Sequence, residues 1–174
     1  MTGVTNRRPR ISKSKISRRN QRSRNRKASE RLTPRNPAEQ KRLNDNMRER
    51  IQEGDLRGVQ NFYFLGAQAD YDPYEFQGST RPLKTPLSWA VFGRYVEIAK
   101  FLLEKGANPN RRNVSFDGGT PLHIAATINH LEIIRLLVEN GADLHIRDNN
   151  RNTPLDLARD PKTAHLLREL GAKE

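Results

Sequence analysis

The sequence predicts an all-α fold in which short helix pairs stack side by side as a solenoid. A Thr-Pro-Leu motif begins at Thr85, Thr120 and Thr153, at spacings of 35 and 33 residues. A Gly-Ala motif follows the first two threonines after 21 residues, at Gly106 and Gly141, and an apolar segment lies between the two motifs each time. Such a period is typical of arrays in which each unit buries its apolar surface against its neighbours.

Two helices are expected in each of the two central units. The first is short and begins at a Thr-Pro pair, because proline is tolerated in the first turn of a helix. The second is the apolar segment, residues 96–103 in one unit and 131–138 in the next, which needs a neighbour on both sides. Each pair ends at a glycine, Gly106 or Gly141, suited to a left-handed cap.

The first unit is degenerate and is recovered by spacing. Leu43, Met47 and Ile51 recur at every fourth position, on a helix that begins at a proline. Arg48 and Arg50 stand where units inside a stack have small or apolar residues. This unit is therefore expected to be an N-terminal cap with an outward-facing polar surface.

The last unit is shortened by Asp160-Pro161, and Arg168 and Glu169 stand in place of leucines or small residues. These features mark a C-terminal cap. The expected units are residues 38–79, 80–114, 115–147 and 148–174. Four units exceed the roughly three that such an array needs for stability.

Together these motifs resemble the ankyrin repeat, whose Thr-Pro-Leu-His-x-Ala core is matched by residues 120–125. The resemblance covers about residues 40–174. It implies an ankyrin solenoid with hairpin-like loops, or fingers, between the helix pairs. It also implies a scaffold that binds another protein and is not an enzyme.

The resemblance places the contact positions on the fingers and inner helices. Phe92, Phe116 and Ile128 suggest an apolar hot spot, because such positions are usually polar. Arg94, Arg111 and Arg112 add a positive rim together with two cations of the contact set. Carried over by alignment, the contact set comprises Arg81, Lys84, Phe92, Gly93, Phe116, Asp117, Gly119, Thr127, Ile128, Asn149, Asn150 and Asn152.

The loop around residues 71–78 is longer than in a standard unit and carries three aromatic residues, Tyr71, Tyr74 and Phe76. Insertions of this kind map to loops on one face of an array, often the binding face. Tyr74 and Phe76 are therefore candidate protein-binding residues. The alternative is that all three aromatic residues fold back over the cap.

A basic tail precedes the repeats. Residues 1–37 hold 13 of the 32 basic residues and one acid, Glu30, whereas residues 38–174 hold 19 of each sign. Too few apolar side chains are present to offset the ordering entropy, so disorder is expected. The candidate nucleic-acid-binding residues are Arg7, Arg8, Arg10, Lys13, Lys15, Arg18, Arg19, Arg22, Arg24, Arg26 and Lys27.

Several functions of the tail are compatible with this composition. It can bind nucleic acid through phosphate contacts, with RNA favoured over DNA, or an import receptor as a nuclear localisation signal. A mitochondrial transit peptide ranks third, because the segment lacks a clear amphipathic face. A solvated charge run without a partner is the simplest alternative.

Enzymatic and membrane functions are not expected. The chain has no cysteine and no apolar run long enough to span a membrane. His123 fits a structural position of the repeat, and the other histidines fall in separate units, so no metal, cofactor or catalytic residue is expected. Trp89 takes the place of a core leucine, which predicts burial.

The sequence therefore predicts a non-enzymatic protein-interaction scaffold with a basic tail, monomeric and intracellular, in the nucleus, the cytoplasm or an organelle. Three functions remain open. One is a nuclear or chromatin-associated adaptor, and the second is an RNA-bound structural component of a ribonucleoprotein such as a ribosome. The third is a small ankyrin inhibitor that occupies the surface of a partner protein.

Overall fold

The computed structural model describes residues 33–71 and 84–173. Over these residues the chain forms seven α-helices and one short 3-10 helix, with no β-strand. The all-α prediction is therefore confirmed. The helices are α2 (Pro37–Gln52), α3 (Leu56–Phe64), α4 (Pro86–Phe92), α5 (Val96–Glu104), α6 (Pro121–Thr127), α7 (Leu131–Glu139) and α8 (Pro161–Glu169), and the 3-10 helix is Val114–Phe116.

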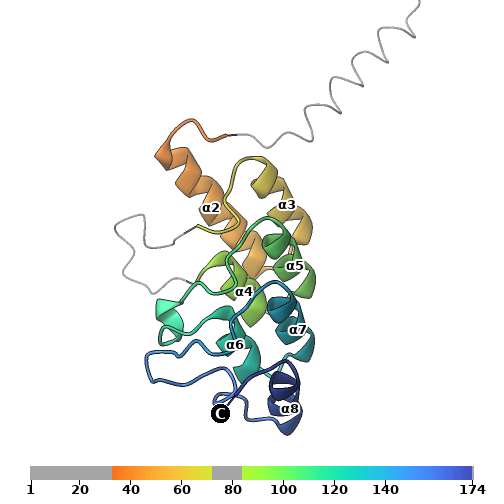
Figure 1. The fold of residues 1–174 in the computed structure, drawn as a ribbon. Helices are drawn as coiled ribbons and strands as arrows, with labels where there is room; N and C mark the ends of the chain where they lie inside the picture. Colours follow the sequence, from red (N-terminus) through yellow and green to blue (C-terminus); the bar gives the residue numbers. More distant parts are fainter. Residues whose placement is uncertain (1–32, 72–83, 174) are drawn as a thin grey trace, which may run out of the picture.

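The helices stack in two layers (Figure 1). The inner layer contains α2, α4 and α6, and the outer layer contains α3, α5, α7 and α8. Each of the first three units is an antiparallel pair of one inner and one outer helix. The loop after an outer helix is called a finger below: the first finger is residues 105–120 and the second is residues 140–153.

The core runs without interruption through the stack. Met47, Leu102 and Leu137 are fully buried in successive units, and Leu167 on α8 closes the far end. Because each unit covers the apolar side of the next, no single pair could form this core alone. The N-terminal cap contributes Met47 and Ile51 to the core, as their spacing predicts.

Helix termini are fixed by residues that the sequence makes recognisable. Thr85 accepts a hydrogen bond from the backbone N–H of Ser88 at the start of α4, 3.2 Å away. A proline follows the cap threonine in both α4 and α6. Gly106 and Gly141 have φ angles of 88° and 87°, the left-handed conformation expected after each outer helix.

The final unit lacks a regular inner helix. Residues 154–157 form a turn, and α8 begins eight residues after Thr153, whereas α5 and α7 begin eleven residues after their Thr-Pro threonines. The side chain of Asp156 accepts hydrogen bonds from the backbone N–H and the hydroxyl of Thr153. Pro161 then disfavours helical geometry at Asp160, which instead caps α8. The shortening predicted from Asp160-Pro161 is thus confirmed.

Tyr71, the first aromatic residue of the long loop, belongs to the core. Its side chain is 3% exposed, and burial raises the pKa of its phenol well above the usual value. For Tyr71 the alternative of packing on the cap is therefore the one observed. Tyr74 and Phe76 lie outside the described residues.

Candidate functional site: the inner helices and fingers

The inner helix α4 carries an aromatic patch, defined as Lys84, Trp89 and Phe92. Phe92 is 49% exposed at the end of α4, and its ring meets that of Trp89 edge to face with centroids 6.5 Å apart. The Lys84 ammonium lies 3.4 Å from the Phe92 ring centroid and 4.6 Å from that of Trp89. Residues 84, 89 and 92 are close together because positions three or four apart share one side of a helix.

The electrostatics of the patch follow from this stacking. Partial burial lowers the pKa of the Lys84 ammonium, because leaving water disfavours the charged form. The faces of the two rings, which carry negative quadrupole density, attract the ammonium in return. Trp89 is half-buried and packs against the core, so the predicted burial is only partial. The patch therefore joins exposed aromatic area to a positive charge.

The inner helix α6 supplies two predicted contact residues. Thr127 is exposed, and its hydroxyl donates a hydrogen bond to the His123 carbonyl oxygen. Ile128 is half-buried, and its carbonyl oxygen accepts a hydrogen bond from the Arg94 guanidinium at 2.8 Å. This bond ties the end of α4 to the end of α6, so these two helix ends belong to one surface.

The first finger is a compact hairpin. Asn113 and Gly119 pair as an isolated antiparallel bridge, with the 3-10 helix between them. Phe116 is half-buried and packs against the core. Asp117 is exposed at the turn in the left-handed conformation, and its carbonyl oxygen accepts a 2.7 Å hydrogen bond from the backbone N–H of Asn149. That last bond links the two fingers.

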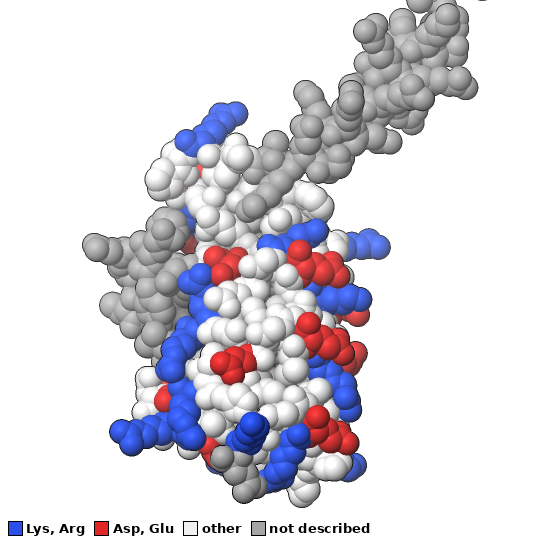
Figure 2. Space-filling view, viewed as in Figure 1, with Lys and Arg blue, Asp and Glu red and all other residues white. Residues whose placement is uncertain are grey.

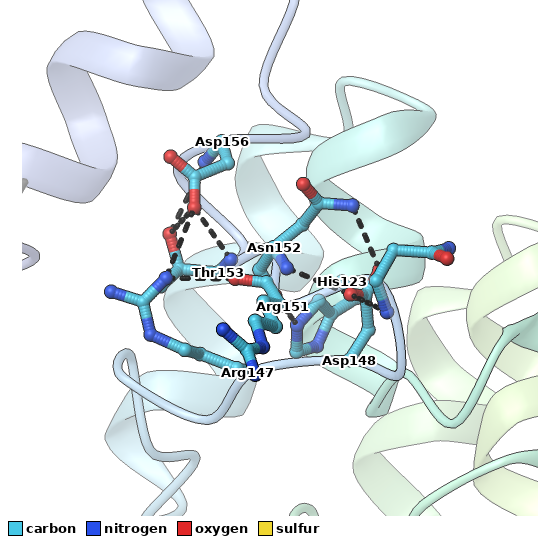
Figure 3. Close-up of polar contacts among 8 residues, drawn as sticks. His123, Arg147, Asp148, Arg151, Asn152, Thr153 and Asp156 are labelled. Atoms are coloured by element: carbon cyan, nitrogen blue, oxygen red, sulfur yellow. Dashed lines mark hydrogen bonds and ion pairs between the residues drawn. The ribbon is translucent and has the colours of Figure 1, made fainter.

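The second finger is held by Asp148, whose side chain is buried (Figure 3). The Asp148 carboxylate accepts hydrogen bonds from the backbone N–H groups of Asn150 and Asn152 and from the Asn152 side-chain amide. Asn149 and Asn150, both predicted contact residues, are exposed on this turn. A loop closed by a buried carboxylate presents its exposed side chains in a fixed arrangement.

His123 fastens α6 to the second finger. Its Nδ1 atom lies 3.0 Å from the backbone nitrogen of Thr120, whose N–H can only donate, so Nδ1 accepts. The proton of the neutral ring is therefore on Nε2, which donates to the Asn152 carbonyl oxygen at 3.0 Å. Burial lowers the pKa of the imidazole, which favours this neutral form. The histidine thus has a structural role.

Arginine side chains project from the fingers. Arg112 donates to the carbonyl oxygens of Gly118 and Arg147, and Arg147 donates to that of Arg151. Figure 2 shows basic side chains in a row down the left margin of this face, where Figure 1 places the 3-10 helix and the loop after α7. Acidic and basic side chains alternate along the opposite margin, over the outer helices.

Sequence reasoning named Arg112 but missed Arg147 and Arg151. A signal was present, since Arg147 follows Arg112 by 35 residues, the same spacing as the first two Thr-Pro motifs. Arg111, placed in the same rim, instead forms a 2.8 Å ion pair with Asp70. Arg81 and the whole candidate nucleic-acid-binding set, residues 7–27, lie outside the described residues.

Two further classes of site were sought in the described residues. Over residues 33–71 and 84–173, no three His, Asp or Glu side chains are grouped as a metal ion would require. No helix in that part of the chain is both long enough and apolar enough to cross a membrane.

Comparisons with known proteins agree with this geometry. A family model described as "Ankyrin repeat" matches residues 83–114, and one described as "Ankyrin repeats (many copies)" matches residues 114–158. With the stacked helix pairs, these matches define a repeat-built protein-interaction module. The chain belongs to the ankyrin-repeat family.

Relatives with very different overall functions share these repeats. The chain is 36% identical over 100 residues to Alpha-latrotoxin-Lg1a of Latrodectus geometricus, covering 57% of this chain and 7% of the toxin. It is 29% identical over 121 residues to the putative E3 ubiquitin-protein ligase XBAT34 of Arabidopsis thaliana, covering 69% and 30%. It is 45% identical over 70 residues to human Ankyrin repeat and KH domain-containing protein 1, covering 40% and 3%.

In each of these relatives the match spans less than a third of the protein's length. The shared part is therefore the repeat array and not a whole protein. Ankyrin repeats generally form non-enzymatic interaction modules, and this chain contains such a module.

Proposed function

We propose that the array binds one protein partner through the aromatic patch and the adjoining fingers. The observation that carries this proposal is Phe92, an aromatic side chain 49% exposed on an inner helix. Aromatic residues dominate the binding energy of protein interfaces because they bury a large area in few rotatable bonds. Phe92 and Trp89 together supply such an anchor, and Lys84 supplies a charge beside it.

The predicted contact residues around the patch fit the same role. Thr127 and Ile128 lie next to it through the bond from Arg94, and Asp117, Asn149 and Asn150 are exposed on the linked fingers. Polar residues around an aromatic centre are the usual composition of an interface rim. Phe116 is a weaker candidate because part of its side chain already packs on the core.

Residues 1–37 are proposed to form a separate basic tail and residues 38–174 the ankyrin domain. The tail's 13 cations favour a polyanion, with RNA ahead of DNA, or an import receptor. A tail bound to one molecule and an array bound to another would raise the effective concentration of each partner for the other. The chain would then be an adaptor, and an RNA-bound component of a ribonucleoprotein is the second candidate, favoured by the arginine content of the tail.

The proposal is tested by capture from an extract of the cells that express the protein. Full-length chain and its Phe92→Asp variant serve as baits, and Leu131→Asp is the matched control, because Leu131 is an exposed apolar residue, 37% exposed, on the outer helix α7. A partner retained by the parent chain and by Leu131→Asp but lost from Phe92→Asp supports the proposal. A set of captured proteins that is identical for all three baits contradicts it.

A further inference from the structure

Three arginines of the fingers form one continuous row. Arg112 lies on the first finger, and Arg147 and Arg151 lie on the second. The guanidinium of Arg112 donates to the backbone oxygen of Arg147, and that of Arg147 donates to the backbone oxygen of Arg151 at 2.7 Å. Each side chain therefore begins where the previous one ends. The name finger row is used below for these three residues.

The row is exposed to solvent and only partly neutralised. Arg112 and Arg151 are exposed, and the Arg147 side chain is 58% exposed. The nearest printed acid is Asp156, whose carboxylate is 4.0 Å from the Arg147 guanidinium and is already hydrogen-bonded to Thr153. Such an exposed pair contributes little. A guanidinium has five N–H donors, so each arginine keeps donors available for an anion.

Arg151 stands in a conformation that an arginine rarely adopts. Its φ is 67°, in the left-handed region where glycine or asparagine is preferred. The turn places asparagines on both sides of it, at Asn150 and Asn152, so residues better suited to the angle are close at hand. Holding an arginine there costs about 1 kcal/mol. The cost is understandable if the charge at this position has a use.

The neighbourhood of the row separates two kinds of anionic ligand. Asp117 is exposed on the first finger, and Asp143 and Asp156 are exposed on and after the second. Closely spaced phosphates would meet these carboxylates as well as the three arginines. A protein segment can space its acids to match the arginines and still insert an apolar side chain at the aromatic patch. An acidic peptide therefore fits better than a nucleic acid.

We propose that the finger row binds the carboxylates of an acidic segment of the protein partner, beside the aromatic patch that holds an apolar side chain of that partner. This inference rests on the proposed function, since it names the chemistry of the same partner. Arginine pairs with carboxylates through two parallel hydrogen bonds, which gives geometric specificity as well as attraction. The row thereby selects acidic segments among those that the patch alone could accept.

The test uses the full chain with the eleven candidate tail cations of residues 7–27 replaced by glutamine, so that the tail cannot bind the probe. The probe is a fluorescein-labelled twelve-residue peptide of alternating Glu and Gly, measured by anisotropy at low salt. We expect Arg112→Gln/Arg147→Gln/Arg151→Asn to weaken binding about tenfold. Arg57→Gln/Lys100→Gln/Arg135→Gln, on the outer helices, removes the same charge and should change it less than about twofold.

A single variant guards against damage to the fold. Arg151→Asn keeps a residue that tolerates the left-handed conformation, and no hydrogen bond from the Arg151 side chain is printed in the described part of the chain. It should weaken peptide binding about threefold without lowering the melting temperature. Equal weakening by the finger and outer-helix triples, or no binding by the parent at millimolar protein, would overturn the inference.

A twelve-nucleotide oligouridylate distinguishes the other ligand class. Tighter binding of this RNA than of the peptide, with the same dependence on the finger row, would assign the row to nucleic acid and overturn the inference. None of these results depends on the capture by Phe92. A partner lost from Phe92→Asp but bound normally by the finger-row triple would keep the proposed function and reject the acidic segment.

Discussion

The Nε2 atom of His123 lies 3.0 Å from the backbone carbonyl oxygen of Asn152, which fastens the inner helix α6 to the second finger (Figure 3). The same ring accepts the backbone N–H of Thr120 at Nδ1, so it spans the start of one unit and the start of the next. One neutral imidazole therefore holds the loop on which Arg147 and Arg151 stand. The position of the finger row depends on this contact.

Stability should fall with pH because of His123. Burial lowers the pKa of this imidazole below its usual value near 6.5, so around and below that pH the unfolded chain binds the proton more readily than the folded one. The stabilising contribution is present above about pH 6.5 and is lost as the pH falls through the lowered pKa. Thermal unfolding between pH 7.5 and pH 5 measures this loss.

The matched variants for this prediction are His123→Gln and His145→Gln. Gln removes the titrating group, so the chain with His123→Gln should be less stable at pH 7.5 but should lose less stability on acidification than the parent. His145 is exposed on the second finger, and its replacement should leave the pH dependence as in the parent. Identical pH profiles for the parent and His123→Gln would contradict the assigned role.

Asp148 should contribute more to stability than its exposed neighbours. Asp148→Ala removes a buried carboxylate that accepts hydrogen bonds from Asn150 and Asn152, at an expected cost of about 2 kcal/mol in the free energy of unfolding. Asn150→Ala on the same turn should change it by less than about 0.5 kcal/mol, as an exposed substitution. Urea unfolding gives both values, and equal costs would show that the carboxylate does not hold the finger.

Two phenylalanines of the predicted contact set should behave differently. Phe116 is half-buried and packs on the core, so Phe116→Ala should cost about 2 kcal/mol of unfolding free energy. Phe92 is 49% exposed, so Phe92→Ala should cost less than about 1 kcal/mol while weakening partner binding. Chemical denaturation separates the two. A large loss at Phe92 would identify it as a core residue and remove the main support for the docking proposal.

The basic tail should bind polyanions without supporting the fold. Charge reversal at Arg18, Arg19, Arg22 and Arg24 should greatly weaken RNA binding, because each phosphate contact contributes roughly 0.7–0.9 to the slope of log affinity against log salt. The melting temperature should not change. Filter binding of an RNA duplex and a single strand across a salt series measures the slope, and a fall in melting temperature would show that the tail packs against the array.

Most of the fold could be predicted from the sequence because repeat positions have fixed structural duties. The Thr-Pro pairs at Thr85 and Thr120 begin helices, Gly106 and Gly141 take left-handed φ angles, and the histidine of the repeat core makes the structural contacts expected of it. These duties are local, set by backbone geometry and by hydrogen bonds within a few residues. They therefore survive translation from sequence pattern to structure.

The candidate site could be predicted only in part, because its geometry depends on side-chain packing across units. The sequence indicated Phe92 and Lys84 separately, but not that the Lys84 ammonium would lie over Phe92 and Trp89. It did not indicate Arg151, since a left-handed arginine leaves no signature in a repeat alignment. Likewise, Phe116 resembled Phe92 as a letter and differs from it in burial.

The central claim is that a protein partner docks on the aromatic patch of α4, and site-specific photo-crosslinking tests it most directly. Benzoylphenylalanine is placed at position 92 of the full chain, or at position 131 on the outer helix α7 as the control, and the cells that express each chain are irradiated. We predict a discrete protein adduct from position 92 and none of the same mass from position 131. The same adducts from both positions, or none from position 92, would contradict the claim.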